Sequence, residues 1–220
     1  MATIADIARQ AGVSVQTVSN VLNGRNKGVR TTANERARRI RAIAQKLNYR
    51  PNASARAMVQ GQTKCIGLLL DPSLLRSAIT PQLVSSLVSN FAGRGYRLVI
   101  NHIPEAAEND AKSLPGILNE WAVDAFAVNY HLDIPEHIVN AIERHKHPWV
   151  SINNKHPNAI YPDEYRAAKT LAQALVDRGC RRLAYVDFSY YHFLAPKRHY
   201  SRTDRLAGYK AVLRKAGREP

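Results

Sequence analysis

The residues best suited to recognition chemistry lie in a short helical pattern near the N-terminus. At 3.6 residues per turn, Val18, Val21 and Leu22 share one face of residues 15–23. The other face carries hydrogen-bonding side chains and one valine, namely Val15, Gln16, Ser19, Asn20 and Asn23. Amides can pair bidentately with adenine and an aliphatic group can contact a thymine methyl, so this face suits base edges in a major groove. A plain αα-corner with a solvated polar face would show the same pattern.

Two short helices joined by a tight turn are expected to position this face. Thr3 can cap the first helix, with the Asp6 carboxylate in its first turn. Gly12 supplies the permissive backbone that ends this helix, and Ser14 is a good N-cap for the next. The apolar face of the first helix consists of Ile4, Ile7, Ala8 and Ala11. The stretch therefore predicts a helix-turn-helix.

The positive charge is concentrated at the N-terminal end of the chain. The 220 residues carry a formal net charge of +15, and residues 1–64 hold 12 Lys and Arg against Asp6 and Glu35. A basic module on a nearly balanced body is typical of a polyanion-binding head on a globular domain. No apolar run approaches the ~20 residues of a transmembrane helix and no signal peptide is evident, so we expect a cytoplasmic protein with no membrane partner.

No catalytic constellation, cofactor motif or metal site is expected from the sequence, so an enzyme is not predicted. Cys65 and Cys180 are the only cysteines, and both are expected to be reduced and buried. Residues 190–193 form an aromatic run that could stack on a ligand, although loop packing is the better interpretation. Several histidines lack Cys or acidic partners at ligand spacing: His131, His137, His145, His147 and His156.

A third helix is expected from Thr32, where Thr32 and Glu35 have the spacing of a capping box. An apolar stripe then covers the first two helices, through Ala37, Ile40, Ala44 and Leu47. The other faces carry arginines that either contact phosphates or form a solvated surface: Arg36, Arg38, Arg39 and Arg41.

A fourth, shorter helix is expected between Asn52 as its N-cap and Gly61 as its terminator, after Pro51 ends the preceding segment. About two and a half turns are too short to be stable alone in water. The segment could therefore fold only when bound, which would make it an order–disorder switch between two domains. A permanently packed linker helix is the alternative.

From Cys65 onward, apolar strands alternate with helices, which predicts a parallel sheet covered on both faces. The expected strands span residues 66–70, 96–101, 125–129 and 149–153. The expected helices span residues 83–93, 106–121 with a kink or restart at Pro115, and 135–145. A second set begins with a helix over 164–178, a strand over 183–187 and a helix over 202–216.

Polar residues follow three of these strands, at the end of the sheet where ligands of open parallel sheets bind. They are Asp71, Asn129 and Asn153, and Arg205 lies near the start of the last helix. A carboxylate, two amides and a guanidinium could together bind a polyhydroxylated or otherwise polar small molecule. Asp and Asn are also common at strand exits for purely local reasons.

From Thr3 to about Gly217, the chain closely resembles the LacI (lactose-repressor) family of bacterial transcription regulators. The most specific parts are residues 11–14 with 17–19, and residues 47–49 with 51–53. Tyr130 after Asn129 and the run 205–209 add to the resemblance in the second domain.

The resemblance implies a homodimer whose paired heads read a pseudo-palindromic DNA operator. It places Val15, Gln16 and Asn20 at the bases. Met58 occupies the position of the minor-groove wedge, which is usually leucine, and Val59 stands where relatives often carry lysine. The remaining positions that the resemblance assigns to DNA binding are Thr3, Ser14, Thr17, Ser19, Asn23, Tyr49, Asn52 and Ala55.

The resemblance also implies a periplasmic-binding-protein-like α/β sensor that binds a small effector, expected to be a sugar or sugar derivative. Asp71, Asn129, Asn153 and Arg205 match its pocket-lining positions, although many relatives have aspartate at the position of Asn153. The expected domains are a helix-turn-helix domain over 1–50, a hinge helix over 51–62, a sensor N-subdomain over 63–156 and the start of a C-subdomain over 157–220. Family members usually continue for roughly another hundred residues, so we expect a fragment of a longer protein.

The sequence predicts a DNA-binding transcriptional regulator that acts as a repressor. A small polar effector would control its affinity for the operator. The mechanism would be a population shift: effector closes the sensor and changes the spacing of the two hinge helices. The alternative is a solute-binding sensor or sugar-processing α/β protein with a basic appendage. A third possibility is a truncated form that fails to dimerise or sequesters a partner.

Overall fold

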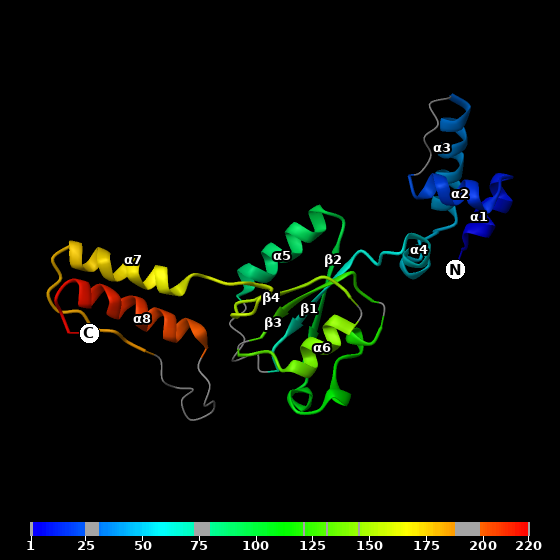
Figure 1. Cartoon of the computed structure of the whole chain (residues 1–220). Helices are drawn as coiled ribbons and strands as arrows, with labels where there is room; N and C mark the ends of the chain where they lie inside the picture. Colours follow the sequence, from blue (N-terminus) through cyan, green and yellow to red (C-terminus); the bar gives the residue numbers. More distant parts are fainter. Residues whose placement is uncertain are drawn as a thin grey trace. The chain divides into compact units, whose positions relative to one another are not determined.

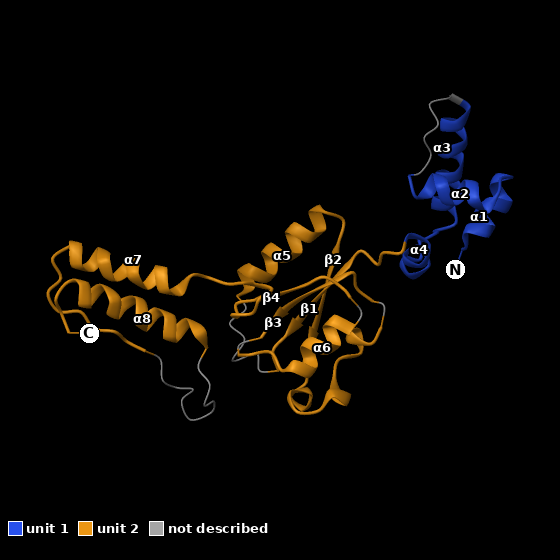
Figure 2. Cartoon of the chain, in the orientation of Figure 1, with its two compact units in different colours: residues 1–60 blue, residues 61–220 orange. Residues whose placement is uncertain are grey.

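The computed structural model describes residues 2–24, 31–72, 80–120, 122–130, 132–144, 146–187 and 199–219. The chain divides into two compact units, residues 1–60 and residues 61–220 (Figure 2).

The first unit is a bundle of short helices: α1 (Ile4–Ala11), α2 (Val15–Leu22), α3 (Thr31–Lys46) and α4 (Ala53–Gln60) (Figure 1). We call this unit, residues 1–60, the head. Its core joins the apolar faces of α1, α2 and α3, and it has the composition that the helical periodicity predicts. The buried members are Ile7, Ala8, Ala11, Val18, Val21, Ala37, Ile40 and Ala44.

The ends of α1 and α2 have the predicted caps. The backbone N–H of Asp6 donates to Thr3 Oγ1 (3.3 Å), and the Asp6 carboxylate accepts from the Thr3 backbone N–H (3.0 Å), which completes a capping box. Gly12 ends α1 in the left-handed conformation, with φ of 64°. Ser14 Oγ accepts from the backbone N–H of Thr17 (3.2 Å) at the start of α2. These caps fix the turn between the two helices.

The start of α3 differs from the prediction. The helix already includes Thr31, so Thr32 is a helical residue and cannot serve as its N-cap. The Thr32–Glu35 capping box was therefore the wrong interpretation. A Thr-x-x-Glu spacing arises by chance within helices, and local sequence does not distinguish a first-turn threonine from a capping one.

The bounds of α4 follow the predicted signals. Asn52 Oδ1 accepts from the backbone N–H groups of Ser54 (2.9 Å) and Ala55 (3.2 Å), and Gly61 follows the helix with φ of 66°. Ala57 is buried, which gives α4 one packed position.

The second unit is built on a parallel five-stranded sheet of order β2-β1-β3-β4-β5. Its strands are β1 (Cys65–Leu70), β2 (Arg97–His102), β3 (Ala125–Asn129), β4 (Trp149–Ile152) and β5 (Ala159–Ile160). The first four agree with the predicted strands to within a residue or so. The two-residue β5 was not expected, because so short a segment carries no periodic signal.

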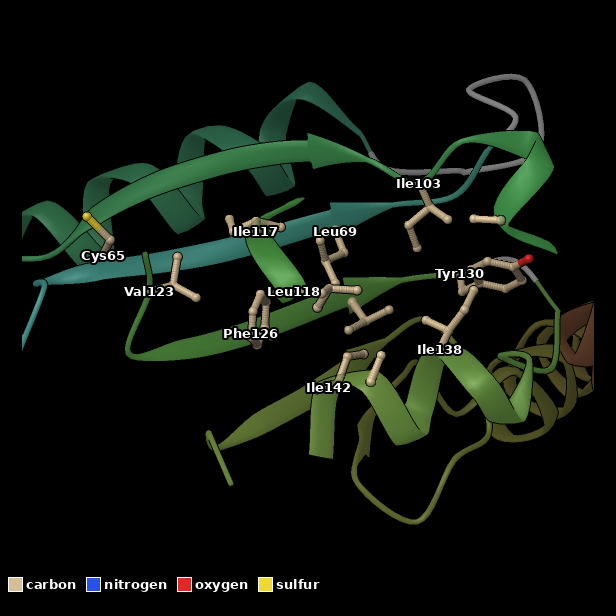
Figure 3. Close-up of a cluster of buried hydrophobic side chains, with 13 residues drawn as sticks. Cys65, Leu69, Ile103, Ile117, Leu118, Val123, Phe126, Tyr130, Ile138 and Ile142 are labelled. Atoms are coloured by element: carbon tan, nitrogen blue, oxygen red, sulfur yellow. The ribbon is translucent and has the colours of Figure 1, made fainter. Parts of the chain in front are cut away.

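Alternate side chains of the sheet enter two different cores. Leu69, Phe126 and Val128 pack with α6 (Glu136–Arg144) and the segment before β3, as Figure 3 shows for Leu69, Phe126, Ile138 and Ile142. The opposite face, with Leu68 and Leu70, packs against Leu87 of α5 (Pro81–Gly93). Gly67 is required at the middle of β1, because a Cβ there would lie 2.8 Å from the Phe126 ring.

The chain enters this sheet through a hydrogen-bonded clamp. Asp124 accepts from the backbone N–H of Thr63 (2.7 Å), the hydroxyl of Thr63 (2.9 Å) and the backbone N–H of Lys64 (2.9 Å). Lys64 adopts a left-handed conformation with φ of 56°, and its ammonium lies 4.6 Å from the centre of the Tyr96 ring. The start of β1 is thereby held to the segment before β3.

Two predicted elements are wrong. In place of a helix over 106–121, the chain forms short 3₁₀ turns at Glu105–Glu108, Ala111–Ser113 and Gly116–Leu118. Asp110 caps the second turn, and Pro115, which has no N–H, separates the second from the third. Residues 183–187 form no strand; Val186 is 90% exposed, and the described part of the chain provides no neighbour for a ladder there.

Two long helices complete the unit, α7 (Glu164–Asp177) and α8 (Tyr200–Lys215), lying side by side (Figure 1). Gly208 of α8 makes this close approach possible, because a Cβ there would overlap the carbonyl oxygen of Tyr165 and lie 3.2 Å from the Ala168 Cβ. Within the described ranges, no helix is both long enough and apolar enough to cross a bilayer.

Candidate nucleic-acid interface and sheet-end site

The outward face of α2 is ordered by its own side chains. Gln16 Nε2 donates to Asn20 Oδ1 (3.0 Å), so the two amides, four residues apart, are paired with each other. Val15 is 51% exposed at the start of the same helix. Two polar side chains and one apolar side chain therefore project from a single rigid surface, as a base-reading helix requires.

Hydroxyl groups line the flanks of this helix. Ser14 Oγ and Thr17 Oγ1 are 2.9 Å apart, and Asn23 Nδ2 donates to Ser19 Oγ (3.2 Å). These short polar groups are of the kind that contact DNA phosphates and fix the register of a protein on the duplex.

A cavity of about 450 Å³ lies within the head, between the ends of α1 and α2 and the helix α4. It brings together half of the residues predicted for DNA binding, namely Thr3, Ser19, Asn23, Tyr49, Asn52 and Ala55. Arg50 and Arg56 also line it, and the sequence interpretation missed both. Their positive charge, on either side of the Asn52 cap, was the signal that could have identified them, since a guanidinium binds a phosphate bidentately.

Large apolar side chains project from α4. Met58 is 78% exposed and Val59 is 74% exposed, whereas their neighbour Ala57 is buried. Val59 lines the cavity of the head, and Met58 does not. An exposed methionine on a short helix is suited to insertion between base pairs, where it would leave water.

The electrostatics of the head favour polyanions. The hydrogen bonds from the Thr3 side chain and backbone hold the pKa of Asp6 below its usual value, so this carboxylate is ionised at neutral pH. Arg9 lies 3.3 Å from it. The head therefore has one of its two carboxylates committed to a helix cap.

At the carboxyl ends of the strands, the structure brings three predicted effector residues to neighbouring positions. Asp71 and Asn129 are buried, and the backbone N–H of Asp71 donates to the carbonyl oxygen of Asn129 (2.9 Å). Asn129 Nδ2 donates to the carbonyl oxygen of Ile152 (3.4 Å), and Asn153 follows β4 in a left-handed conformation with φ of 60°. These side chains lie near one another at the carboxyl-terminal end of the sheet.

The start of α8 contacts this end of the sheet through two residues that the sequence interpretation missed. His199 Nε2 lies 2.9 Å from the carbonyl oxygen of Asn153, and the Tyr200 hydroxyl donates to Asn153 Oδ1 (3.2 Å). Burial, with the nearby Glu164 carboxylate, raises the pKa of Tyr200 to about 12, so its hydroxyl remains a donor at neutral pH. The helix predicted over 202–216 starts two residues earlier than expected, so that Tyr200 is its first residue and His199 its N-cap.

Arg205 forms a bidentate ion pair with Glu164 of α7, with both N–O distances 2.6 Å. The hydrogen bond to Glu164 raises the pKa of Arg205. The structure thus joins Arg205 to the α7–α8 pair, and its role in effector binding stays a prediction.

The remaining candidates fall into two groups. His131, His145 and the aromatic run 190–193 lie outside the described residues. His137 Nε2 lies 2.6 Å from the carbonyl oxygen of Ala107, His147 is in an edge-to-face contact with Phe126, and the His156 ring lies tilted against Trp149. Among the described side chains, no group of three or more potential metal ligands occurs.

Sequence comparisons match this organisation. Residues 3–52 match the family model for bacterial regulatory proteins of the lacI family. A protein named HTH-type transcriptional repressor PurR from Klebsiella pneumoniae subsp. pneumoniae is 26% identical, over 98% of this chain and 61% of its own length. The protein of the same name from Edwardsiella ictaluri is also 26% identical, over 100% and 62%. The chain spans about three-fifths of the length of these relatives.

Solved structures show the same fold. The lac repressor dimer bound to operator and the anti-inducer ONPF aligns with a TM-score of 0.73 at 22% identity, over 100% of this chain and 63% of that chain. A transcriptional regulator CelR–cellobiose complex aligns with a TM-score of 0.54 at 21% identity, over 100% and 63%. The predicted fold class, a helix-turn-helix head followed by a parallel α/β unit, is confirmed.

Proposed function

We propose that this chain, whose residues 3–52 match the lacI-family model and whose α/β unit has the fold found in LacI-type regulators, is a sequence-specific transcriptional repressor. The observation that carries the proposal is the arrangement of the head. A rigid pair of amides on α2 stands beside a cavity lined by hydroxyls, amides and two guanidinium groups. Base edges and the phosphate backbone need these two kinds of group.

In this proposal, α2 lies in the major groove. Gln16 and Asn20 hydrogen-bond base edges, and Val15 contacts a thymine methyl. The cavity beside α2 takes the sugar-phosphate backbone, with Arg50 and Arg56 as additional phosphate ligands. Met58 enters the minor groove and opens a base step.

A homodimer fits the exposed apolar surface of the second unit. Helix α5 has no buried residue although it is rich in apolar side chains, and Val88 is 45% exposed. Strand β2 is at the edge of the sheet, and Ile100 is 48% exposed. An uncovered edge strand and helix favour pairing with a second copy, which would set two heads on a pseudo-palindromic operator.

The effector is proposed to be a small polar molecule, a sugar or sugar derivative, held at the carboxyl-terminal end of the sheet by Asp71, Asn129, Asn153 and Arg205. Hydrogen-bonding side chains at neighbouring positions support this choice. The complex of a structural neighbour with cellobiose is consistent with a carbohydrate. Effector binding would change operator affinity by linkage between the two units.

The DNA-reading assignment is tested by selecting bound sites from random DNA with the wild type and with Gln16→Ala/Asn20→Ala. We expect the wild type to enrich a palindrome and the double variant to lose that preference while it keeps salt-sensitive binding. Asn34→Ala/Gln45→Ala, which removes two exposed amides of α3, is the matched control and should select the wild-type site. Unchanged site preference in the Gln16/Asn20 variant would overturn the assignment.

The effector class is tested by thermal shift with two ligand panels, neutral sugars and purine bases. A rise in unfolding temperature with a sugar, reduced in Asn153→Ala, is the expected result. Stabilisation by a purine alone would replace the sugar with a heteroaromatic effector. Tight small-molecule binding together with no preferred DNA site would favour a solute-binding sensor with a basic appendage.

A further inference from the structure

A basic surface on α3 has no role in the function proposed above. Its members are Arg36, Arg38, Arg39, Arg41 and Lys46, all of them exposed. We call these five residues the α3 basic face. The arginines form two like-charged pairs three residues apart, Arg36 with Arg39 and Arg38 with Arg41. Residues at this spacing are neighbours on a helix, where like charges repel.

The charge of this face is not balanced within the head. Asp6 and Glu35 are the only acidic residues among positions 1–60. Asp6 takes part in the cap of α1 and contacts Arg9. Glu35 lies one turn before Arg38 and Arg39, and in the described part of the chain none of the α3 cations forms an ion pair with a carboxylate. An external anion would therefore relieve the repulsion.

The centre of the α3 basic face, at Arg38, Arg39 and Lys46, points away from the core of the head, and Arg36 and Arg41 flank the buried stripe on opposite sides. Ala37, Ile40 and Ala44 form the buried stripe of α3, packed against α1 and α2. At 100° per residue, Arg38 and Arg39 straddle the direction opposite this stripe. The base-reading face of α2 points outward from the same core on the side of α2. The two surfaces therefore lie on different sides of the head.

We propose that the α3 basic face is a second phosphate-binding surface, which holds a second DNA segment while α2 lies on the first. Closely spaced guanidinium groups are suited to phosphates, because each can form two parallel hydrogen bonds with phosphate oxygens. DNA fits better than an acidic protein patch, since the five cations lie along residues 36–46 of α3, about 15 Å of helix, and a duplex presents phosphates regularly over such a length. The proposal does not depend on base reading by α2, because phosphate contacts carry no sequence information.

The test compares the full chain with Arg38→Gln/Arg39→Gln. The matched control is Arg181→Gln/Arg182→Gln, which removes two adjacent exposed arginines from the second unit. Affinity for a random 40-base-pair duplex is measured against salt. Each lost phosphate contact should lower the slope of log K against log salt by about 0.9, so the α3 variant should lose about 1.8 per head and the control nothing.

A stoichiometric titration distinguishes a second, independent DNA-binding surface from an extension of the surface that includes α2. With a random 12-base-pair duplex at low salt, the wild type should bind two duplexes per chain and Arg38→Gln/Arg39→Gln one. Arg38→Lys/Arg39→Lys keeps the charge and should keep the wild-type slope, which distinguishes lost phosphate contacts from a misfolded head.

An unchanged slope in the α3 variant, or an equal loss in the control, would overturn the proposal. So would one duplex per chain in the wild type. Phosphatidylglycerol vesicles and poly-glutamate are run in parallel. Binding of either that depends on Arg38 and Arg39, with DNA binding unaffected, would assign the face to a membrane or an acidic protein instead. This proposal is tested by the salt slope and the stoichiometry, whereas the base-reading proposal is tested by the site preference of Gln16→Ala/Asn20→Ala. Failure of one proposal can therefore be distinguished from failure of the other.

Discussion

Single hydroxyl and carboxylate groups cap the first two helices of the head. Ser14 and Thr3 were both identified as caps from the sequence, and each forms the expected hydrogen bonds. Thr32 was identified by the same reasoning and lies inside a helix. The difference is in the preceding residues. Gly12 ends α1 in the left-handed conformation just before Ser14, whereas Thr32 follows Thr31, which is already helical.

Replacing Ser14 with alanine should lower the free energy of unfolding of the head by about 1 kcal/mol, because the backbone N–H of Thr17 loses its acceptor. Urea unfolding followed by circular dichroism measures the change. Ser85→Ala, an exposed position inside α5, is the control and should change stability by less than about 0.5 kcal/mol. Equal effects of the two substitutions would contradict a capping role for Ser14.

The Asp6 carboxylate should make head stability pH-dependent in acid. Its pKa is lowered in the folded state by the Thr3 hydrogen bonds, so its stabilisation is present above the unfolded pKa and is lost as pH falls through the folded pKa. The unfolding temperatures of the wild type and Asp6→Asn should therefore differ at pH 7 and converge as the pH falls through the lowered pKa of Asp6. Glu35→Gln is the control for carboxylate removal in the same unit. A constant difference between wild type and Asp6→Asn at every pH would refute the mechanism.

At the scale of elements, regular periodicity was predictable and tertiary pairing was not. The helices of the head and the first four strands follow from apolar spacing with caps and glycines. Residues 106–121 have helical composition, yet Asp110 and Pro115 divide them into 3₁₀ turns. Residues 183–187 are apolar enough for a strand, but a strand also needs a neighbour with which to form a ladder.

The same limit applies to the candidate site. Asp71, Asn129 and Asn153 could be grouped from the sequence because the ends of parallel strands share an edge. The contacts of Tyr200 and His199 with Asn153 depend on where α8 begins, which no local signal gives. Arg50 and Arg56 required the three-dimensional cavity for their recognition.

The packing of α7 on α8 should depend on Gly208. Gly208→Ala places a methyl group against the Tyr165 carbonyl and should reduce the free energy of unfolding of the second unit by about 1–3 kcal/mol. Gly93→Ala, near the end of α5, is the control, because a Cβ at Gly93 would meet nothing within 4 Å. Denaturant unfolding monitored by tryptophan fluorescence and circular dichroism gives both values. A neutral Gly208→Ala would mean that the helices can move apart without cost.

At the scale of the whole molecule, the excess positive charge and the proposed dimer surface are assigned to different units. The head holds most of the excess charge, and the second unit has Val88 and Ile100 on an uncovered helix and edge strand. The two surfaces therefore respond to different solution conditions: salt weakens the first, and the second depends on chain concentration.

Charged substitutions on α5 and β2 should break the proposed dimer. We expect Val88→Glu/Ile100→Glu to sediment as a monomer at concentrations where the wild type is dimeric, because two carboxylates would be buried without partners. Ile160→Glu, at a 69% exposed position of β5, is the control and should remain dimeric. A dimer that persists in the double variant would place the interface on another surface.

In the unbound head, the hydrogen bond between Gln16 and Asn20 competes with the hydrogen bonds that these amides would form with bases. The bond uses one N–H of Gln16 and the Oδ1 of Asn20, so a base that takes this donor and this acceptor gains only the difference between its own hydrogen bonds and the one that it replaces. A site that bonds only one of the two amides must offset the loss of this bond, whereas a site that bonds both replaces the internal bond and adds to it. The head should therefore move easily along unrelated DNA and stop at correct sites, with a discrimination that is steeper than the number of its base contacts would suggest.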